Sequence, residues 1–177
     1  AVCHVDYVLK SNWLIDSAKA GKFISPEPYT IQYIDVDDLR YDLSKVLYSQ
    51  SRSTLFAGKY FFITPDVFPS SRDIEKMIKS AGGIVEPKRR SAVVIADSQA
   101  RCPDTYIIIT CVKDLSLIYD LIRNEKKPKC LILSTEFVMS SILTQKLEIE
   151  SSKLEFYSTV NNNNNSNALN NNYNNKK

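Results

Sequence analysis

The fold is decided by the stretch CLILSTEFVMSSIL, residues 130–143. Its first four residues are apolar and predict a short buried strand, and the residues from Phe137 onward predict an apolar helix. Between the two, Thr135 carries a hydroxyl that we expect to accept a hydrogen bond from a free N–H group of the first helical turn. The stretch therefore predicts a strand, a cap and a helix in direct succession.

The same pattern occurs near the start of the chain, in the segment YVLKSNWLI at residues 7–15. It predicts a strand around Val5–Leu9 and a helix over Asn12–Ala20 that Gly21 ends. There Ser11 takes the place of Thr135, and Trp13 takes the place of Phe137. Repeats that lie about 100 residues or more apart indicate two domains in tandem rather than small stacked units. Because the first copy comes so early, we expect this chain to be a fragment that contains only the last part of the first domain.

Composition and charge limit the classes of function. The chain has 177 residues, of which 44% are hydrophobic and 24% are charged, as in an ordinary globular protein. Its net charge of +3 is too balanced to indicate a nucleic-acid-binding protein. The four cysteines form no CxxC pair, which favours a reducing compartment and disfavours a zinc site. No apolar run approaches the roughly 18 residues that span a bilayer, so we expect a soluble chain without membrane contact. We also expect no metal ion and no cofactor.

The chain divides into four expected parts: the end of a first domain at 1–32, a linker at 33–54, a second domain at 55–157 and an Asn-rich tail at 158–177. In the linker, apolar residues at helical spacing from Leu39 to Leu47 follow the acidic Asp35, Asp37 and Asp38, which suit a helix N-terminus. This pattern predicts a linker helix. The tail has almost no apolar surface to bury, so we expect it to be disordered.

The second domain shows the alternation of strands and helices that is typical of an α/β fold. The expected strands are Tyr60–Thr64, Ile84–Val85, Tyr106–Cys111 and Cys130–Leu133. One expected helix begins at Ser70 or Ser71 and ends at Gly82-Gly83, a second covers residues 115–122, and a third begins at Phe137. The segment Ala92–Ala96 fits either a strand or a short helix. The order β-α-β-β-α-β-α predicts a four-stranded, mostly parallel sheet with helices on both faces.

Several of these stretches resemble BRCT domains. In the second domain the resemblance lies in Tyr60–Thr64, Ala81–Val85 and Ser134–Val138, which carry the first strand, the Gly-Gly after the first helix and the aromatic of the last helix. In the first domain, Ser11–Lys22 resembles the closing helix of another BRCT domain, with Trp13 in the usual aromatic position. The resemblance implies a tandem BRCT pair whose first repeat is truncated here.

The resemblance also implies a function. Paired BRCT domains bind phosphoserine or phosphothreonine peptides in the groove between the repeats, in nuclear DNA-damage or chromatin proteins, and a phosphorylated histone tail is one such ligand. By the resemblance, the phosphate pocket belongs to residues that precede Ala1. The second repeat would supply an apolar specificity pocket, and the matching residues are Phe68, Thr135 and Met139. An alternative role for these three residues is packing between the domains.

The second repeat carries a degenerate copy of the phosphate site. Thr64 and Lys113 match the hydroxyl and the ammonium group that the family uses. Pro65 stands where the family has a glycine, and proline has no backbone N–H to donate. We therefore predict that this repeat does not bind phosphate by itself.

Other functions are less well supported by the sequence. The chain has no GxGxxG or GxxxxGK[ST] motif, and its one histidine, His4, has no plausible Ser or Cys partner, so we expect no enzyme. The basic triplet Lys88–Arg90 is either a solvated surface or a phosphate contact. A structural BRCT pair that binds an unmodified protein or DNA remains the alternative, although the charge balance does not favour direct DNA binding.

Overall fold

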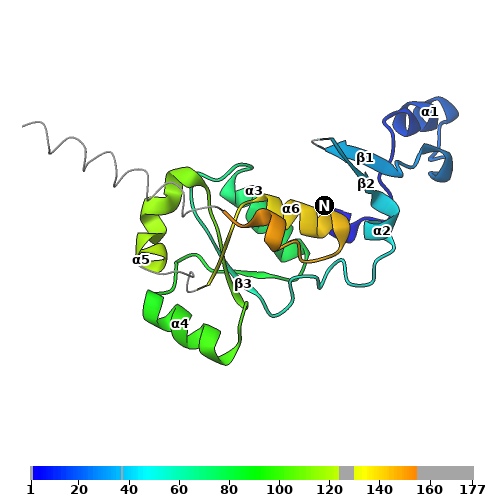
Figure 1. The fold of residues 1–177 in the computed structure, drawn as a ribbon. Coiled ribbons are helices and arrows are strands. Elements are labelled where there is room, and N and C mark those ends of the chain that lie inside the picture. Colours follow the sequence, from blue (N-terminus) through cyan, green and yellow to red (C-terminus); the bar gives the residue numbers. More distant parts are fainter. Residues whose placement is uncertain (1, 37, 124–129, 155–177) are drawn as a thin grey trace, which may run out of the picture.

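The computed structural model describes residues 2–36, 38–123 and 130–154. A sheet flanked by helices forms the larger part, and the helix α1 (Asn12–Ala20) lies at the opposite end of the molecule from this sheet (Figure 1). The predicted Asn-rich tail and Asp37 lie outside the described residues.

The central sheet is four-stranded and parallel throughout. It consists of β3 (Tyr60–Ile63), β4 (Ile84–Val85), β5 (Tyr106–Ile109) and β6 (Leu131–Leu133), in the spatial order β4-β3-β5-β6. β3 pairs with both β4 and β5, and β5 pairs with β6. All four strands occur where the sequence predicts them, because each is a short apolar run bounded by turn residues.

Helices cover both faces of the sheet. One face contacts α3 (Ser71–Ser80) and α6 (Glu136–Thr144), and the other contacts α4 (Ala92–Arg101) and α5 (Tyr119–Ile122). Because strand side chains alternate, Ile107 and Ile109 of β5 pack on the α3–α6 side, whereas Tyr106 and Ile108 pack on the α4–α5 side. This arrangement confirms the predicted α/β class with helices on both faces.

Two helical segments differ from the predicted order. The open segment Ala92–Ala96 belongs to α4, because the Ser91 hydroxyl accepts from the Val94 N–H and caps a helix there. A helix therefore stands between β4 and β5, and the predicted β-β succession is wrong at this point. The first half of the predicted helix over 115–122 belongs to a 3-10 helix, η3 (Val112–Ile118), and its second half is the single turn α5.

The N-terminal segment confirms one element and corrects another. α1 has the predicted bounds and ends at Gly21, which has the left-handed φ of 65°. The strand that we expect around Val5–Leu9 does not form, and only Leu9 makes an antiparallel bridge, to Thr30. A strand needs a neighbouring strand to satisfy its backbone, and the described residues supply none beyond this bridge.

The predicted hydroxyl caps are also wrong. Ser11 and Thr135 precede their helices with backbone angles that are already helical, φ −56° and ψ −27° for Ser11 and φ −63° and ψ −23° for Thr135. Capping by a side chain needs an extended backbone at that residue, so neither hydroxyl accepts from a helical N–H.

The linker contains a hairpin before its helix. β1 (Tyr33–Val36) and β2 (Leu39–Asp42) pair in antiparallel fashion, and α2 (Leu43–Leu47) begins only after them. The Asp42 carboxylate accepts from the Ser44 N–H at 3.0 Å and fixes this start. The prediction of a helix from Leu39 is therefore wrong over β2, whereas the buried residues of α2 do pack against α6.

Candidate functional site

The loop between β3 and α3 presents Phe68 to solvent. The side chain of Phe68 is 88% exposed. The Thr135 hydroxyl, at the start of α6, donates to the Phe68 carbonyl oxygen at 2.7 Å. The structure therefore brings two of the three predicted pocket residues together through the backbone of Phe68, while its phenyl ring is exposed.

Met139, the third predicted residue, lies one turn further along α6. It lines a groove of about 520 Å³ together with Met77 of α3 and Leu39 of β2. Phe68 and Thr135 do not line this groove. Thr135 and Met139 are four positions apart and share one side of α6, but of the three predicted residues only Met139 lines this groove.

The hairpin side of the groove is a feature that sequence reasoning missed. The register pairs Val36 with Leu39 and Ile34 with Tyr41, so these four side chains share one face of the β1–β2 hairpin. Val36, Leu39 and Tyr41 line the groove opposite α6. The signal was the alternation of apolar and polar residues in residues 33–42, which indicates strands rather than a helix.

The loop that carries Phe68 is fixed by a hydrogen bond to the buried carboxylate of Asp114. Asp114 is 4% exposed, and its Oδ2 accepts from the Asp66 N–H at 2.8 Å. The Cys111 thiol adds a longer contact by donating to the Asp66 carbonyl at 3.5 Å. With the Thr135 bond at its other end, the loop is tied to η3 and to α6, so Phe68 has a defined position.

The degenerate phosphate residues are not arranged around a free anion site. Thr64 is fully buried, and its hydroxyl donates to the Thr110 Oγ1 at 3.0 Å. Lys113 is exposed at the start of η3. Pro65 offers no N–H, and the next one, on Asp66, already donates to the Asp114 carboxylate. The first N–H after Pro65 is therefore already bonded to the Asp114 carboxylate and is not available to a phosphate.

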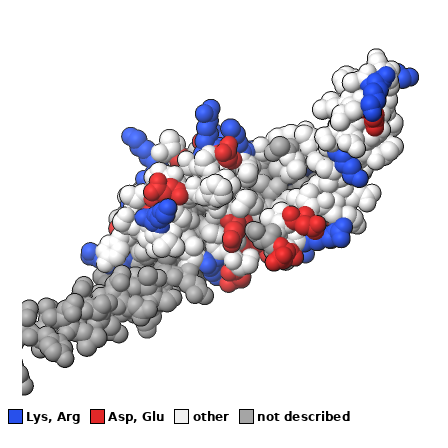
Figure 2. All heavy atoms as spheres, turned by 90° about the horizontal axis from the view of Figure 1, so that it is seen from above, with Lys and Arg blue, Asp and Glu red and all other residues white. Residues whose placement is uncertain are grey.

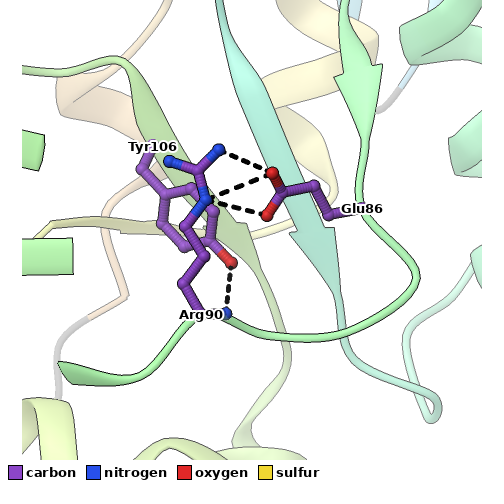
Figure 3. Close-up of polar contacts among 3 residues, drawn as sticks. All are labelled: Glu86, Arg90 and Tyr106. Atoms are coloured by element: carbon purple, nitrogen blue, oxygen red, sulfur yellow. Dashed lines mark hydrogen bonds and ion pairs between the residues drawn. The ribbon is translucent and has the colours of Figure 1, made fainter. Parts of the chain in front are cut away.

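Two members of the basic triplet have structural contacts. Arg90 donates to both carboxylate oxygens of Glu86, with Nη2–Oε1 at 2.6 Å, and its backbone N–H donates to the Tyr106 hydroxyl at 3.1 Å (Figure 3). Its guanidinium also lies 4.6 Å from the ring centroid of Tyr60 and 4.8 Å from that of Tyr106. Arg89 pairs with Asp120 at 3.1 Å. These arginines stabilise the fold, which argues against the triplet as a phosphate contact.

Charge and metal-binding groups are dispersed. On the face drawn in Figure 2, basic and acidic residues are interspersed rather than gathered into one basic patch. Over the described ranges no group of three or more His, Cys, Asp or Glu side chains is placed to hold a metal ion. Burial raises the pKa of the Cys130 thiol to about 12, so this thiol is neutral at physiological pH. Among the described helices, none has the length and apolarity needed to cross a membrane.

Comparison with known proteins gives consistent results. Residues 54–166 match the family model of the BRCT domain. The chain is 28% identical over 155 residues to PAX-interacting protein 1 from Bos taurus, which covers 86% of this chain and 15% of that protein. It is 27% identical over 168 residues to mediator of DNA damage checkpoint protein 1 from Mus musculus, which covers 86% of this chain and 8% of that protein. The chain therefore spans only a small part of these curated relatives.

The similarity to PAX-interacting protein 1 is also expected from the sequence, on Phe56–Pro65, Glu136–Val138 and Leu143–Leu147, and the comparison confirms it. No enzyme family is indicated by these matches, and BRCT domains are interaction modules.

Solved structures of BRCT pairs share the fold. The BRCT5-BRCT6 domains of S. pombe Brc1 superpose with a TM-score of 0.60 at 16% identity, covering 89% of this chain and 77% of that chain. The complex of Rtt107p with a phosphorylated histone gives a TM-score of 0.53 at 19% identity, covering 84% of this chain and 65% of that chain. The family model covers more than half of the sequence, and the parallel sheet has the expected helices on both faces. The chain therefore belongs to the BRCT domain family.

Proposed function

We propose that this chain is the closing part of a tandem BRCT pair that binds phosphoserine or phosphothreonine peptides, as a non-enzymatic module of a nuclear DNA-damage or chromatin scaffold. The observation that carries the proposal is Phe68, exposed and held by the Thr135 hydroxyl, beside a groove lined by Met139. The complex of Rtt107p with a phosphorylated histone, which shares the fold, supports a phosphorylated histone tail as the ligand.

In this proposal the two repeats divide the ligand between them. The second repeat, residues 55–157, supplies apolar contacts through Phe68 and Met139 and a polar edge through Thr135. It does not bind the phosphate, because Thr64 is buried and Asp114 occupies the N–H of Asp66. The phosphate is bound by the first repeat, of which residues 1–32 are the closing part, and residues 33–54 link the repeats.

The experiment is a phosphopeptide library screen on a protein that includes the whole first repeat. We expect that pair to enrich phosphorylated sequences and to lose them after phosphatase treatment, since charge-assisted bonds to a dianionic phosphate are strong. The 177-residue chain itself is the matched control and should show no dependence on phosphorylation. If phosphatase treatment leaves the enriched sequences unchanged for the intact pair, the proposal is wrong.

A second candidate is a BRCT pair that recognises an unmodified protein, and the apolar groove favours it. DNA is less suited to the molecule, because Arg89 and Arg90 are engaged with Asp120 and Glu86. DNA binding would be supported instead by an affinity for DNA that is independent of base sequence and that falls steeply with salt concentration.

A further inference from the structure

We propose that the segment Glu155–Tyr157 extends the central sheet by one antiparallel strand along the outer edge of β6. The edge is formed by the backbone of Cys130–Leu133, and the chain's own segment is its occupant. The inference does not rest on peptide binding, because none of the residues Cys130–Leu133 lines the groove that contains Met139.

The outer edge of β6 presents backbone groups that can pair with a further strand. In the sheet order β4-β3-β5-β6, β6 is an edge strand among the described residues. The Thr110 N–H donates to the Leu133 carbonyl oxygen at 3.0 Å, so Leu133 directs its backbone groups toward β5. Backbone groups alternate in direction along a strand, so those of Ile132 and Cys130 point to the outer edge. Such an edge is a template for pairing with another extended segment.

The chain reaches this edge just before the segment begins. The Ser134 N–H donates to the Ser152 carbonyl oxygen at 3.0 Å, and Lys153 forms an antiparallel bridge with Leu133. Ser152 is 2% exposed, and its hydroxyl donates to the Glu148 carbonyl oxygen at 2.9 Å, which fixes the point of entry. The bridge therefore sets both the direction and the register of the residues that follow.

The register assigns a partner on β6 or at its start to each following residue. In an antiparallel pair, one step forward on one strand is matched by one step back on the other. Continued from the bridge, this rule gives the pairs Leu154 with Ile132, Glu155 with Leu131, and Phe156 with Cys130. Paired residues share a face of the sheet, and Leu154 and Ile132 both pack in the cluster on the α4–α5 side. The last described residue thus already follows the register.

The side chains of residues 153–156 alternate as a half-buried edge strand requires. Lys153 and Glu155 are charged, whereas Leu154 and Phe156 are apolar. Residues two positions apart share a face, so Phe156 faces the α4–α5 side with Leu154. Its assigned partner Cys130 is 8% exposed and belongs to the same cluster. The ring would therefore bury apolar surface there, while backbone pairing would close the β6 edge to other chains.

The experiment is NMR spectroscopy of the ¹³C,¹⁵N-labelled 177-residue chain. Because Leu133 directs its backbone groups toward β5, Leu131 does so as well, and the pair of Leu131 with Glu155 is a non-hydrogen-bonded one. Such a pair brings the two Cα atoms to about 4.5 Å, so we expect a nuclear Overhauser effect between their Hα atoms. The bridged pair of Leu133 with Lys153 is the internal control and should give the same effect.

Two neighbouring aromatic residues provide a matched pair of variants. Phe156→Ser removes the ring that faces the cluster and should speed hydrogen exchange at the Cys130 and Ile132 amides at least about fivefold. Tyr157→Ser removes an aromatic ring from the next position, which faces the other side of the sheet. This control should change the exchange of the same amides by less than about twofold.

Three results would overturn the inference. The first is a missing contact between Leu131 and Glu155 in a sample where the control contact is present. The second is an equal change of amide exchange in the two variants. The third is a contact seen only between differently labelled chains in a mixed sample, which would assign the edge to a second copy. No peptide ligand is used, so failure here is distinct from failure of phosphopeptide binding by the intact pair.

Discussion

Replacing Arg90 with alanine should destabilise the second repeat by about 2–4 kcal/mol. The guanidinium of Arg90 lies between the rings of Tyr60 and Tyr106 and pairs with the Glu86 carboxylate, at the start of β3 and β5. This cluster joins the loop after β4 to the central strands, so its loss should lower the free energy of unfolding of the whole domain.

The magnitude follows from the contacts that disappear. The Arg90 and Glu86 side chains are 23% and 24% exposed, so their ion pair is only partly screened by water. Removing Arg90 leaves the Glu86 carboxylate partly buried without its partner, which should cost about 1–2 kcal/mol, less than the loss of a fully buried pair. Two cation–π contacts add about 0.5–1 kcal/mol each.

The assay is urea unfolding of the 177-residue chain followed by far-UV circular dichroism, with the slope of the transition checked for constancy. Arg101→Ala is the matched control, because Arg101 pairs with Asp97 on α4 while the two side chains are 71% and 66% exposed. That variant should lose less than about 1 kcal/mol. A loss for Arg90→Ala that is no larger than the loss for Arg101→Ala would refute the assigned role of the cluster.

Three further predictions concern packing, pH and the Phe68 loop. Gly83→Ala should cost about 1–3 kcal/mol in urea unfolding, because a Cβ there would lie 2.6 Å from a side-chain atom of α3, and unchanged stability would contradict this. Burial raises the pKa of the Cys130 thiol from 9.0 to about 12, so the unfolded chain loses this proton at lower pH than the folded chain, and the free energy of unfolding should fall as pH rises through that range. The free energy of unfolding of Cys130→Ala should fall less steeply over the same range, and equal slopes for the two proteins would contradict the burial of the thiol. Thr135→Val should cost about 1 kcal/mol and increase amide exchange around Phe68, and unchanged exchange would show that the 2.7 Å bond does not hold the loop.

The central sheet could be predicted from the sequence because its strands leave little choice. β5 and β6 are short, continuously apolar runs that end at polar residues, and such runs suit strands covered on both faces. The segment Ala92–Ala96 is apolar in the same way, but it lies in a longer helix, since the capping bond of Ser91 and the length of the segment decide between the two structures.

The linker and the candidate site were harder to predict because tertiary contacts decide them. Leu39 and Leu43 have helical spacing, but Leu39 pairs with Val36 in a hairpin whose apolar face covers part of α6. The local sequence predicts that Thr135 caps a helix, but its hydroxyl donates to the carbonyl oxygen of Phe68, which is far away in the sequence. Residue types alone indicated that Thr135 mattered, but they did not show what it contacts.

The ionic contacts of the arginines depend on partners that no local pattern identifies. Arg90 finds Glu86 four residues earlier, which a sequence can suggest, but the stacking on Tyr60 and Tyr106 requires β3 and β5 to be neighbours. A basic triplet whose sequence fits a solvated surface is therefore partly a structural element.

The central claim is that the tandem pair recognises a phosphorylated peptide and that this chain supplies the apolar contacts rather than the phosphate pocket. The most direct measurement is calorimetric titration of one phosphoserine peptide and its unphosphorylated twin into both the intact pair and the 177-residue chain. The account predicts preference for the phosphorylated peptide by the intact pair and no preference by this chain. Equal binding of the two peptides to the intact pair, or micromolar binding of the phosphopeptide to this chain with a preference for phosphate, would contradict it.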